Sequence, residues 1–160
     1  MAKVHKGRYT AAVNGEFVVF LIGMRFNKLW KIHRWMPVFV AMPRMQRVLQ
    51  KNPDRGLLHT RLAFGGRTIT SIQYWRSFEH LERFARNPDD PHLEPWRRFN
   101  KKIGASGDVG VYHETYKVHP GDHESIYSNM TKMGLAAAGT HLSVDAAREA
   151  ARQRMGATSA

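Results

Sequence analysis

Residues 57–76 read LLHTRLAFGGRTITSIQYWR, and this stretch decides the fold. Two segments rich in apolar residues, 57–64 and 68–76, are separated by the dipeptide Gly65-Gly66. Two glycines readily take the positive φ angles that a two-residue hairpin turn requires. The stretch therefore predicts two neighbouring antiparallel strands in the middle of the chain.

The segments on both sides of this hairpin carry helical patterns. Before it, residues 27–50 have apolar side chains at helical spacing, and Asn27 is placed to cap the start. Two prolines inside this range predict a kinked helix or two consecutive helices. After the hairpin, Ser77 is placed to cap a second helix with one apolar face, and a third, short helix is predicted over residues 92–103.

Two more strands frame this arrangement. Residues 17–22 (FVVFLI) form a short run of β-branched and aromatic residues, and residues 109–118 (VGVYHETYKV) alternate in polarity. The order strand, helix, strand, strand, helix, strand is that of a ferredoxin-like α+β fold, with a four-stranded antiparallel sheet and helices on one face. We expect the domain to span residues 13–142, with residues 1–12 and 143–160 as terminal extensions.

Composition narrows the class of protein. A length of 160 residues suits a single domain, and the absence of cysteine excludes disulfides and thiolate metal sites. The formal net charge is +12, but the basic residues are scattered, which favours a solvated surface over a specific nucleic-acid partner. Neither a signal-peptide core nor a membrane-length apolar run is present, so we expect a cytoplasmic protein without membrane insertion.

A sheet with helices on only one face leaves its other face to be covered, and three solutions are open. The face may bind RNA through aromatic side chains, pack on a second copy of the chain, or be covered by the segment that follows Pro120. Residues 68–75 (TITSIQYW) lack the aromatic signature of RNA-recognition domains, which argues against the first solution.

The chain resembles a fumagillin-type monooxygenase-like family, a branch of the antibiotic-biosynthesis monooxygenases among the dimeric α+β barrels. The segments that carry this resemblance are FVVFLIGMRFNKLWKIHRW (17–35), SIQYWRSFEHLERFAR (71–86), HLEPWRRF (92–99), VGVYHETYKV (109–118) and IYSNMTKMGLA (126–136). The resemblance spans roughly residues 13–140 and implies a homodimer. It also implies a pocket between sheet and helices in which an apolar secondary metabolite meets O2, either without a cofactor or with haem.

The resemblance indicates four catalytic candidates, and each has a structural alternative. His92 and His113 are placed to act as bases or, if haem is bound, as its ligand; for His92 a surface position is an equal alternative. His113 lies on the same face of the predicted strand as Val109 and Val111, so it is expected to point inward, and a core residue with satisfied hydrogen bonds is the alternative. For Trp75 the alternatives are an indole N–H that donates to the substrate and a ring that packs in the core, and for Asn27 they are a hydrogen bond to oxygen or substrate and a helix cap.

Further residues are candidates for binding the substrate, and no metal ligand is assigned beyond the haem possibility. Recognisable zinc, serine-nucleophile, Walker and dinucleotide motifs are missing. Two other hypotheses about function stay open. The first is a haem-binding enzyme of another class, aldoxime dehydratase-like or haem-degrading, and the second is a non-catalytic protein that binds an apolar ligand. The substrate-binding candidates are Arg25, Tyr74, Tyr112, Tyr116 and Tyr127.

Overall fold

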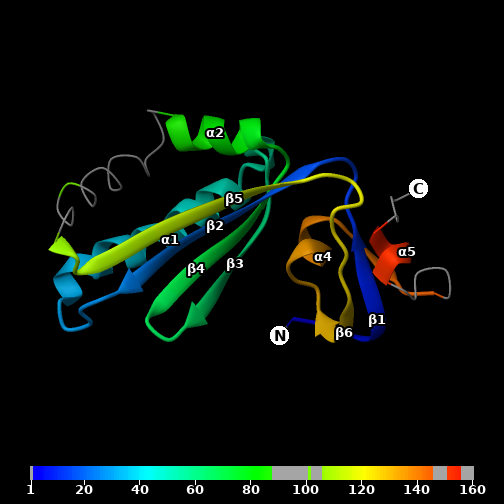
Figure 1. The fold of residues 1–160 in the computed structure, drawn as a ribbon, viewed down its shortest axis with the longest axis horizontal. Helices are drawn as coiled ribbons and strands as arrows, with labels where there is room; N and C mark the ends of the chain where they lie inside the picture. The colour runs from blue at the N-terminus through cyan, green and yellow to red at the C-terminus, as the bar shows by residue number, and fades with distance from the viewer. Residues whose placement is uncertain (1, 88–100, 102–105, 146–150, 156–160) are drawn as a thin grey trace.

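The computed structural model describes residues 2–87, 101, 106–145 and 151–155 (Figure 1). The strands are β1 (Val4–Ala12), β2 (Phe17–Phe26), β3 (Leu57–Gly65), β4 (Thr68–Trp75), β5 (Val109–Val118), β6 (Tyr127–Thr131) and β7 (Thr140–Ser143). The helices are α1 (Ile32–Gln50), α2 (Phe78–Arg86), α4 (Leu135–Ala138) and α5 (Ala151–Met155), with a 3-10 turn η1 (Pro53–Arg55).

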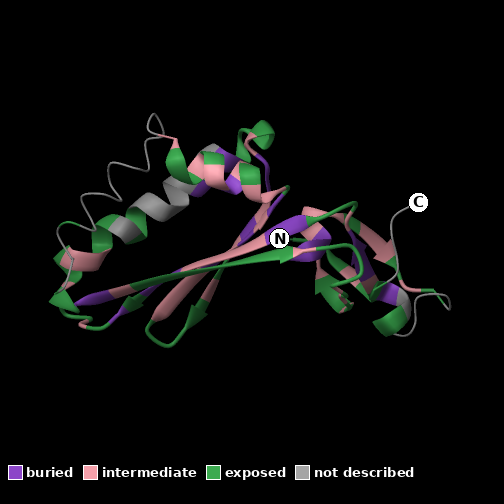
Figure 2. Ribbon diagram, turned by 45° about the horizontal axis from the view of Figure 1, so that its top comes forward, coloured by how far each residue is buried: buried purple, intermediate pink, exposed green. Residues whose placement is uncertain are grey.

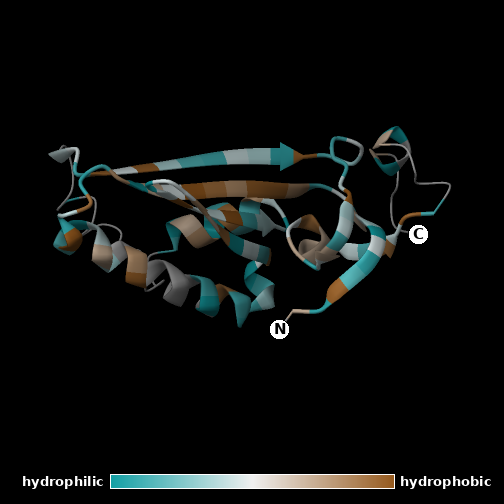
Figure 3. Ribbon diagram, turned by 90° about the horizontal axis from the view of Figure 1, so that it is seen from below, coloured by the Kyte–Doolittle hydropathy of each residue, from teal (hydrophilic) through white to brown (hydrophobic). Residues whose placement is uncertain are grey.

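The main layer is a four-stranded antiparallel sheet in the order β3-β4-β2-β5, which confirms the predicted ferredoxin-like α+β class. Helices α1 and α2 pack on one face of this sheet, which we call the helix face; α1 lies beneath the sheet in Figure 3. The opposite face is called the open face. Since strand side chains alternate, each residue of the sheet belongs to one face or the other.

The core lies between the helix face and the two helices. Its larger cluster joins side chains of β2, β3 and β4 to one leucine from each helix: Val18, Leu49, Leu57, Trp75 and Leu81. A second cluster forms at the far end of the sheet from Met24, Phe26 and Val109, with Trp35 packed against it. Figure 2 shows these buried segments in purple where the strands pass under the helices.

Residues 4–12, expected as part of a terminal extension, form a strand. β1 is the central strand of a second, three-stranded sheet in the order β6-β1-β7. Its partners come from the segment after Pro120, which lies more than a hundred residues further along the chain. Short polar strands of this kind are specified by their partners, because their own sequence has no clear alternation.

The segment from β6 to β7 covers one end of the open face. Leu135 and Ala136 of α4 are buried against Ala11 and Phe17, and Val19 and Tyr74 pack around them. Figure 1 shows α4 facing the ends of β3 and β4, while the rest of the open face carries no element of the described chain. Of the three solutions considered for this face, the C-terminal segment therefore supplies part of the cover.

Two features that depend only on residues adjacent in the sequence were predicted correctly. The hairpin between β3 and β4 turns at Gly66, whose φ is 57°, as predicted. Ser77 caps α2 and accepts a hydrogen bond from the backbone N–H of His80 at 3.4 Å. In the described residues, no helix is long and apolar enough to cross a membrane.

Helix α1 differs from its prediction in two respects. It begins at Ile32 after Lys31, so Asn27 is not its cap, and it is one helix through Gln50 although Pro37 lies within it. Packing of its buried Leu49 against the sheet compensates for the backbone hydrogen bonds that prolines remove. The third helix, predicted over residues 92–103, falls almost entirely outside the described residues.

Candidate functional site

The sheet separates the candidate residues into two groups on opposite faces. Trp75 packs in the core of the helix face, and Tyr74, the residue before it, packs with the open-face cluster around Phe17. His113 likewise neighbours Phe20 on the helix face, whereas Tyr112 lies over Gly23 on the open face. The candidates therefore do not form a single site.

Trp75 is fully buried, at 0% exposure, and its role is packing. Its ring lies 5.4 Å from that of Phe84, and Val18 and Leu81 belong to the same cluster. The indole N–H donates to Oε1 of Gln73 at 2.9 Å. Because indole has a single donor, Trp75 has none left for a substrate.

A buried hydrogen-bond network continues from Trp75, and the sequence analysis missed it. The Ser71 hydroxyl accepts from Nε2 of Gln73 at 3.2 Å and from Nε2 of Gln46 at 2.7 Å, and it lies 3.2 Å from Oγ1 of Thr60. Since Ser71 accepts twice, its own proton is directed to Thr60. Strand alternation was the available signal, because residues two and four positions before Trp75 must share its face.

His113 lies on the helix face, as its alternation predicted, but it is exposed. It pairs with Ile22 across the β2–β5 ladder, and its ring centroid lies 5.9 Å from that of Phe20. β5 is an edge strand, so α1 and α2 do not cover it as they cover β4. The imidazole has no hydrogen bond within the described part of the chain, which leaves both ring nitrogens available.

Asn27 links two loops at the end of the sheet. Its Nδ2 donates to the Gly107 carbonyl at 3.0 Å, and its backbone N–H donates to the Asp108 carbonyl at 3.2 Å. The Asp108 carboxylate is buried and binds Lys31 at 2.8 Å and Lys28 at 2.9 Å. Hydrogen bonds from Lys31 and Lys28 lower the pKa of Asp108 to about 2. Asn27 thus joins the loop before α1 to the start of β5.

On the bare part of the open face, Tyr112 lies across the sheet. Its hydroxyl is 2.6 Å from Oγ1 of Thr70, and a Cβ added at Gly23 would overlap its ring. The glycine therefore provides the space that the ring occupies. Arg25, at the end of β2, is exposed on this face opposite Thr68.

Tyr116 forms a local pair on β5. Its hydroxyl donates to Oε2 of Glu114 at 2.6 Å, and this hydrogen bond raises the pKa of Tyr116. Both side chains are exposed. The arrangement is a surface contact between alternate residues of one strand.

Tyr74 and Tyr127 are the two candidates that the fold brings together. A Cβ added at Gly134 would lie 3.4 Å from Oη of Tyr74 and 3.5 Å from Oη of Tyr127, so both hydroxyls flank that glycine. Tyr127 accepts the backbone N–H of Ala136 at 3.2 Å. Burial raises the pKa of Tyr74, Tyr127 adds to this increase, and the charge of Arg61 opposes it.

Two residues that the sequence analysis did not single out adjoin this pair. His59 is paired with Tyr74 across the β3–β4 ladder, with ring centroids 6.3 Å apart, and Arg61 follows on the same face. Burial lowers the pKa of His59, and the charge of Arg61 lowers it further. The available signal was again spacing, since His59 and Arg61 alternate on the strand that pairs with Tyr74.

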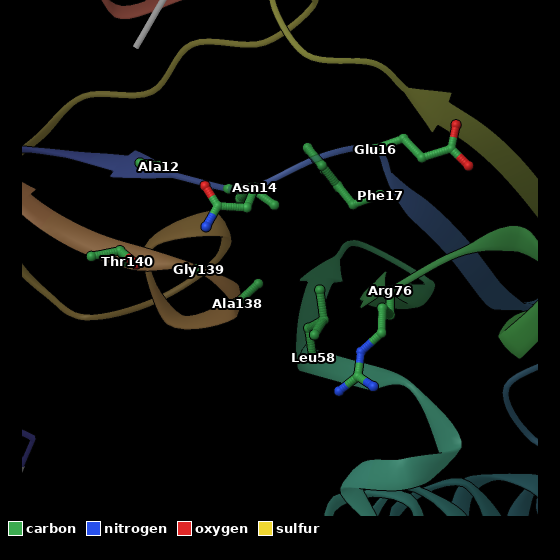
Figure 4. Close-up of a pocket in the computed structure, with 10 residues that line it drawn as sticks. Ala12, Asn14, Glu16, Phe17, Leu58, Arg76, Ala138, Gly139 and Thr140 are labelled. Atoms are coloured by element: carbon green, nitrogen blue, oxygen red, sulfur yellow. The ribbon is translucent and has the colours of Figure 1, made fainter. Parts of the chain in front are cut away.

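A pocket of about 310 Å³ lies between the two sheets. Figure 4 shows Leu58 and Arg76 on one side of it and Asn14, Ala138 and Gly139 on the other. None of the candidates that the structure describes lines this pocket. Within residues 2–87, 101, 106–145 and 151–155, no three His, Asp or Glu side chains gather as a metal site. His92 lies outside the described residues.

The family comparison matches the four-stranded sheet and its helices. The model of the monooxygenase af470-like family matches residues 17–135, which is more than half of the chain. This chain belongs to that family. A curated relative, monooxygenase af470 of Aspergillus fumigatus, is 28% identical over 157 residues, covering 81% of this chain and 53% of the relative. The chain thus spans about half the length of the relative it matches.

The part shared with the monooxygenase af470-like family contains both faces of the main sheet. It includes the Trp75 network, His113 and the Tyr74–Tyr127 pair, and it ends at Leu135 in α4. Strands β1 and β7 lie outside it. Of the three strands of the second sheet, only the edge strand β6 therefore lies inside the matched region, whereas the central strand β1 and the other edge strand β7 lie outside it.

Proposed function

We propose that this protein is a monooxygenase that oxidises an apolar secondary metabolite with O2. Family membership supports the general class. The structural observation that carries the proposal is an available imidazole, that of His113, beside apolar surface at the edge of the helix face. Phe20 and Phe78 are only partly buried there, and Val111 is exposed.

In the cofactor-independent form of the reaction, His113 takes a proton from the substrate. Histidine suits proton transfer near neutral pH, and its ring has no competing hydrogen bond to a described residue. The deprotonated, electron-rich substrate then supplies all four electrons to O2, so that one oxygen atom enters the product, the other leaves as water, and the substrate carbon is oxidised from CH2 to C=O. The partly buried rings of Phe20 and Phe78 offer aromatic surface for the apolar body of the substrate.

In the alternative form of this proposal the protein binds haem, and one described residue, His113, is suited to bind the haem iron. His113 offers an unpaired ring nitrogen, as an iron ligand requires, and its ring centroid lies 5.9 Å from that of Phe20. Haem bound there would supply oxygen activation. The same ligand would serve a haem enzyme of another reaction class, so spectroscopy must accompany the activity measurement.

The test is oxygen uptake by the purified protein with a panel of apolar polyketides and terpenoids. Mass spectrometry with isotopically labelled O2 identifies products that have gained one oxygen atom. We expect His113→Ala to lower the rate by roughly 100-fold or more, since a general base commonly contributes that much. The matched control is His33→Ala, an exposed histidine on α1, which leaves the rate unchanged.

Equal rates in wild type and His113→Ala would remove His113 from the reaction, and binding of the panel without oxygen uptake would favour a ligand-binding protein. Titration with haemin separates the two forms of the proposal. A stoichiometric Soret band that His113→Ala abolishes and His33→Ala retains supports the haem form. Turnover without such a band supports the cofactor-independent form.

We also propose that the protein is a homodimer, in which a second copy covers the bare part of the open face around Tyr112 and Ile72. Both residues lie away from the segment that covers the other end of this face. Sedimentation velocity measures the state directly. A monomer at all accessible concentrations would contradict the dimer and leave the proposed oxidation to be judged on its own test.

A further inference from the structure

Three polar groups on the covered end of the open face have no partner. Nε2 of His59 and Nε of Arg61 are buried and form no hydrogen bond. The hydroxyl of Tyr74 donates no hydrogen bond to any residue that the structure describes, although Tyr74 is half-buried. Native proteins satisfy nearly all buried polar atoms, so the two buried nitrogens of His59 and Arg61 call for an explanation, and their position on one face of one strand calls for a common one.

These groups lie next to one another. Tyr74 is directly opposite His59 in the β3–β4 ladder, and Arg61 follows His59 by two residues on the same face. Tyr127 approaches from the second sheet, and the hydroxyls of Tyr127 and Tyr74 lie 3.5 Å and 3.4 Å from the position that a Cβ of Gly134 would occupy. Two strands of one sheet and one strand of the other therefore converge on a common point.

The cluster has more donors than acceptors. Arg61 forms no ion pair in the described part of the chain, so its guanidinium keeps its donors. Tyr127 already accepts the N–H of Ala136, which leaves its own proton to donate. Burial and then the charge of Arg61 lower the pKa of His59, which favours the neutral imidazole, and a neutral imidazole has one donor nitrogen. Such a set is suited to a group that carries negative charge on oxygen.

We propose that His59, Arg61, Tyr74 and Tyr127 bind the carboxylate, or an equivalent anionic oxygen group, of a small ligand with an apolar body. The planar guanidinium of Arg61 matches the two oxygens of a carboxylate, and the tyrosine hydroxyls add single hydrogen bonds. Phe17, Val19 and Leu135 pack around this end of the sheet and provide apolar surface for the body.

This site goes beyond the proposed oxidation. It lies on the opposite face of the sheet from His113, and it requires binding only, so its test does not depend on turnover. A carboxylate from a second copy of the chain is a different occupant with the same chemistry. The experiment therefore measures oligomeric state beside small-molecule binding.

The probes are naphthoate and its neutral analogue naphthamide, which have the same ring system and differ in charge. Binding to the full chain is measured by isothermal titration calorimetry, with chemical-shift changes of the ligand as a second readout. We expect naphthoate to bind at least about tenfold more tightly than naphthamide, since the added charge pairs with Arg61. Arg61→Gln should remove this preference, and Tyr74→Phe should weaken naphthoate binding by a smaller factor.

Arg67→Gln is the matched control. It removes the same charge from an exposed arginine at the hairpin turn at the other end of β3 and β4, so it should bind naphthoate as the wild type does. Thermal melting confirms that both variants are folded. Equal binding of the two probes, no binding at millimolar concentration, or equal loss in both arginine variants would overturn the proposal. The proposal would also be overturned if Arg61→Gln dissociated the dimer while naphthoate showed no binding, because Arg61 would then pair with a second copy of the chain.

Discussion

The two faces of the main sheet satisfy their polar groups differently, and the adjacent residues Trp75 and Tyr74 show the contrast. On the helix face, the indole N–H of Trp75 enters a buried network that continues through Gln73 to Ser71. On the open face, Tyr74 stands beside the unpaired nitrogens of His59 and Arg61. A closed network contributes to stability, whereas unpaired donors indicate a place for a ligand.

The largest effect should come from truncating Trp75. Trp75→Ala removes a fully buried ring and strands the Gln73 amide oxygen, so we expect a loss of about 3–5 kcal/mol in the free energy of unfolding. Tyr74→Phe, one residue earlier, removes a hydroxyl without a partner and should change stability by about 0.5 kcal/mol or less. Urea unfolding monitored by circular dichroism measures both. Similar losses in the two variants would abolish the contrast between the faces.

The next effect concerns the network itself. Ser71→Ala leaves the amides of Gln73 and Gln46 without their shared acceptor, and we expect a loss of about 1–3 kcal/mol although hardly any volume is removed. Thr70→Ala is the control on the open face, where water replaces the lost contact to Tyr112 and the cost is about 1 kcal/mol or less. A cost for Ser71→Ala no greater than that for Thr70→Ala would show that the network is not closed.

A smaller effect should appear only as pH falls. Burial and the charge of Arg61 lower the pKa of His59 below its ordinary value of 6.5, so the unfolded chain binds its proton more readily than the folded chain does. The stability that His59 contributes is therefore present above pH 6.5 and is lost as pH falls below it. We expect His59→Gln to flatten the dependence of the unfolding midpoint between about pH 7.5 and 5.5. His33→Gln, on an exposed site, should retain the wild-type slope.

Much of this fold was predictable because its signals are local. The Gly65-Gly66 hairpin and the Ser77 cap depend on neighbouring residues, and the structure has both. β1 was not predictable, since VHKGRYTAA has no clear alternation and pairs with strands more than a hundred residues away. The start of α1 was misplaced because Asn27 is suited equally to a cap and to the loop contact that it makes with Gly107.

The candidate residues show where spacing was informative and where it was not. Strand alternation places Trp75 and Tyr74 on opposite faces of the sheet, and it separates His113 from Tyr112 in the same way. Applied to the sequence, this rule would have predicted two groups of candidates instead of one site. Alternation does not reveal partners. Gln73 accepts the indole N–H of Trp75, whereas Nε of Arg61 has no acceptor. This difference depends on rotamers and on contacts between strands, which the sequence does not specify.

The smallest effect should come from Tyr112→Phe, which tests whether the bare part of the open face is separate from the covered part. The Tyr112 hydroxyl contacts Thr70 at 2.6 Å in an exposed position, where water substitutes readily, so the variant should lose about 0.5 kcal/mol or less in urea unfolding. Naphthoate binding should be unchanged, because Tyr112 lies over Gly23, away from the Tyr74–Tyr127 pair. If Tyr112→Phe weakened naphthoate binding as much as Arg61→Gln, the ligand would spread over the whole open face. The bare part would then be a binding surface in its own right, and the place proposed for a second copy of the chain would have to be sought elsewhere.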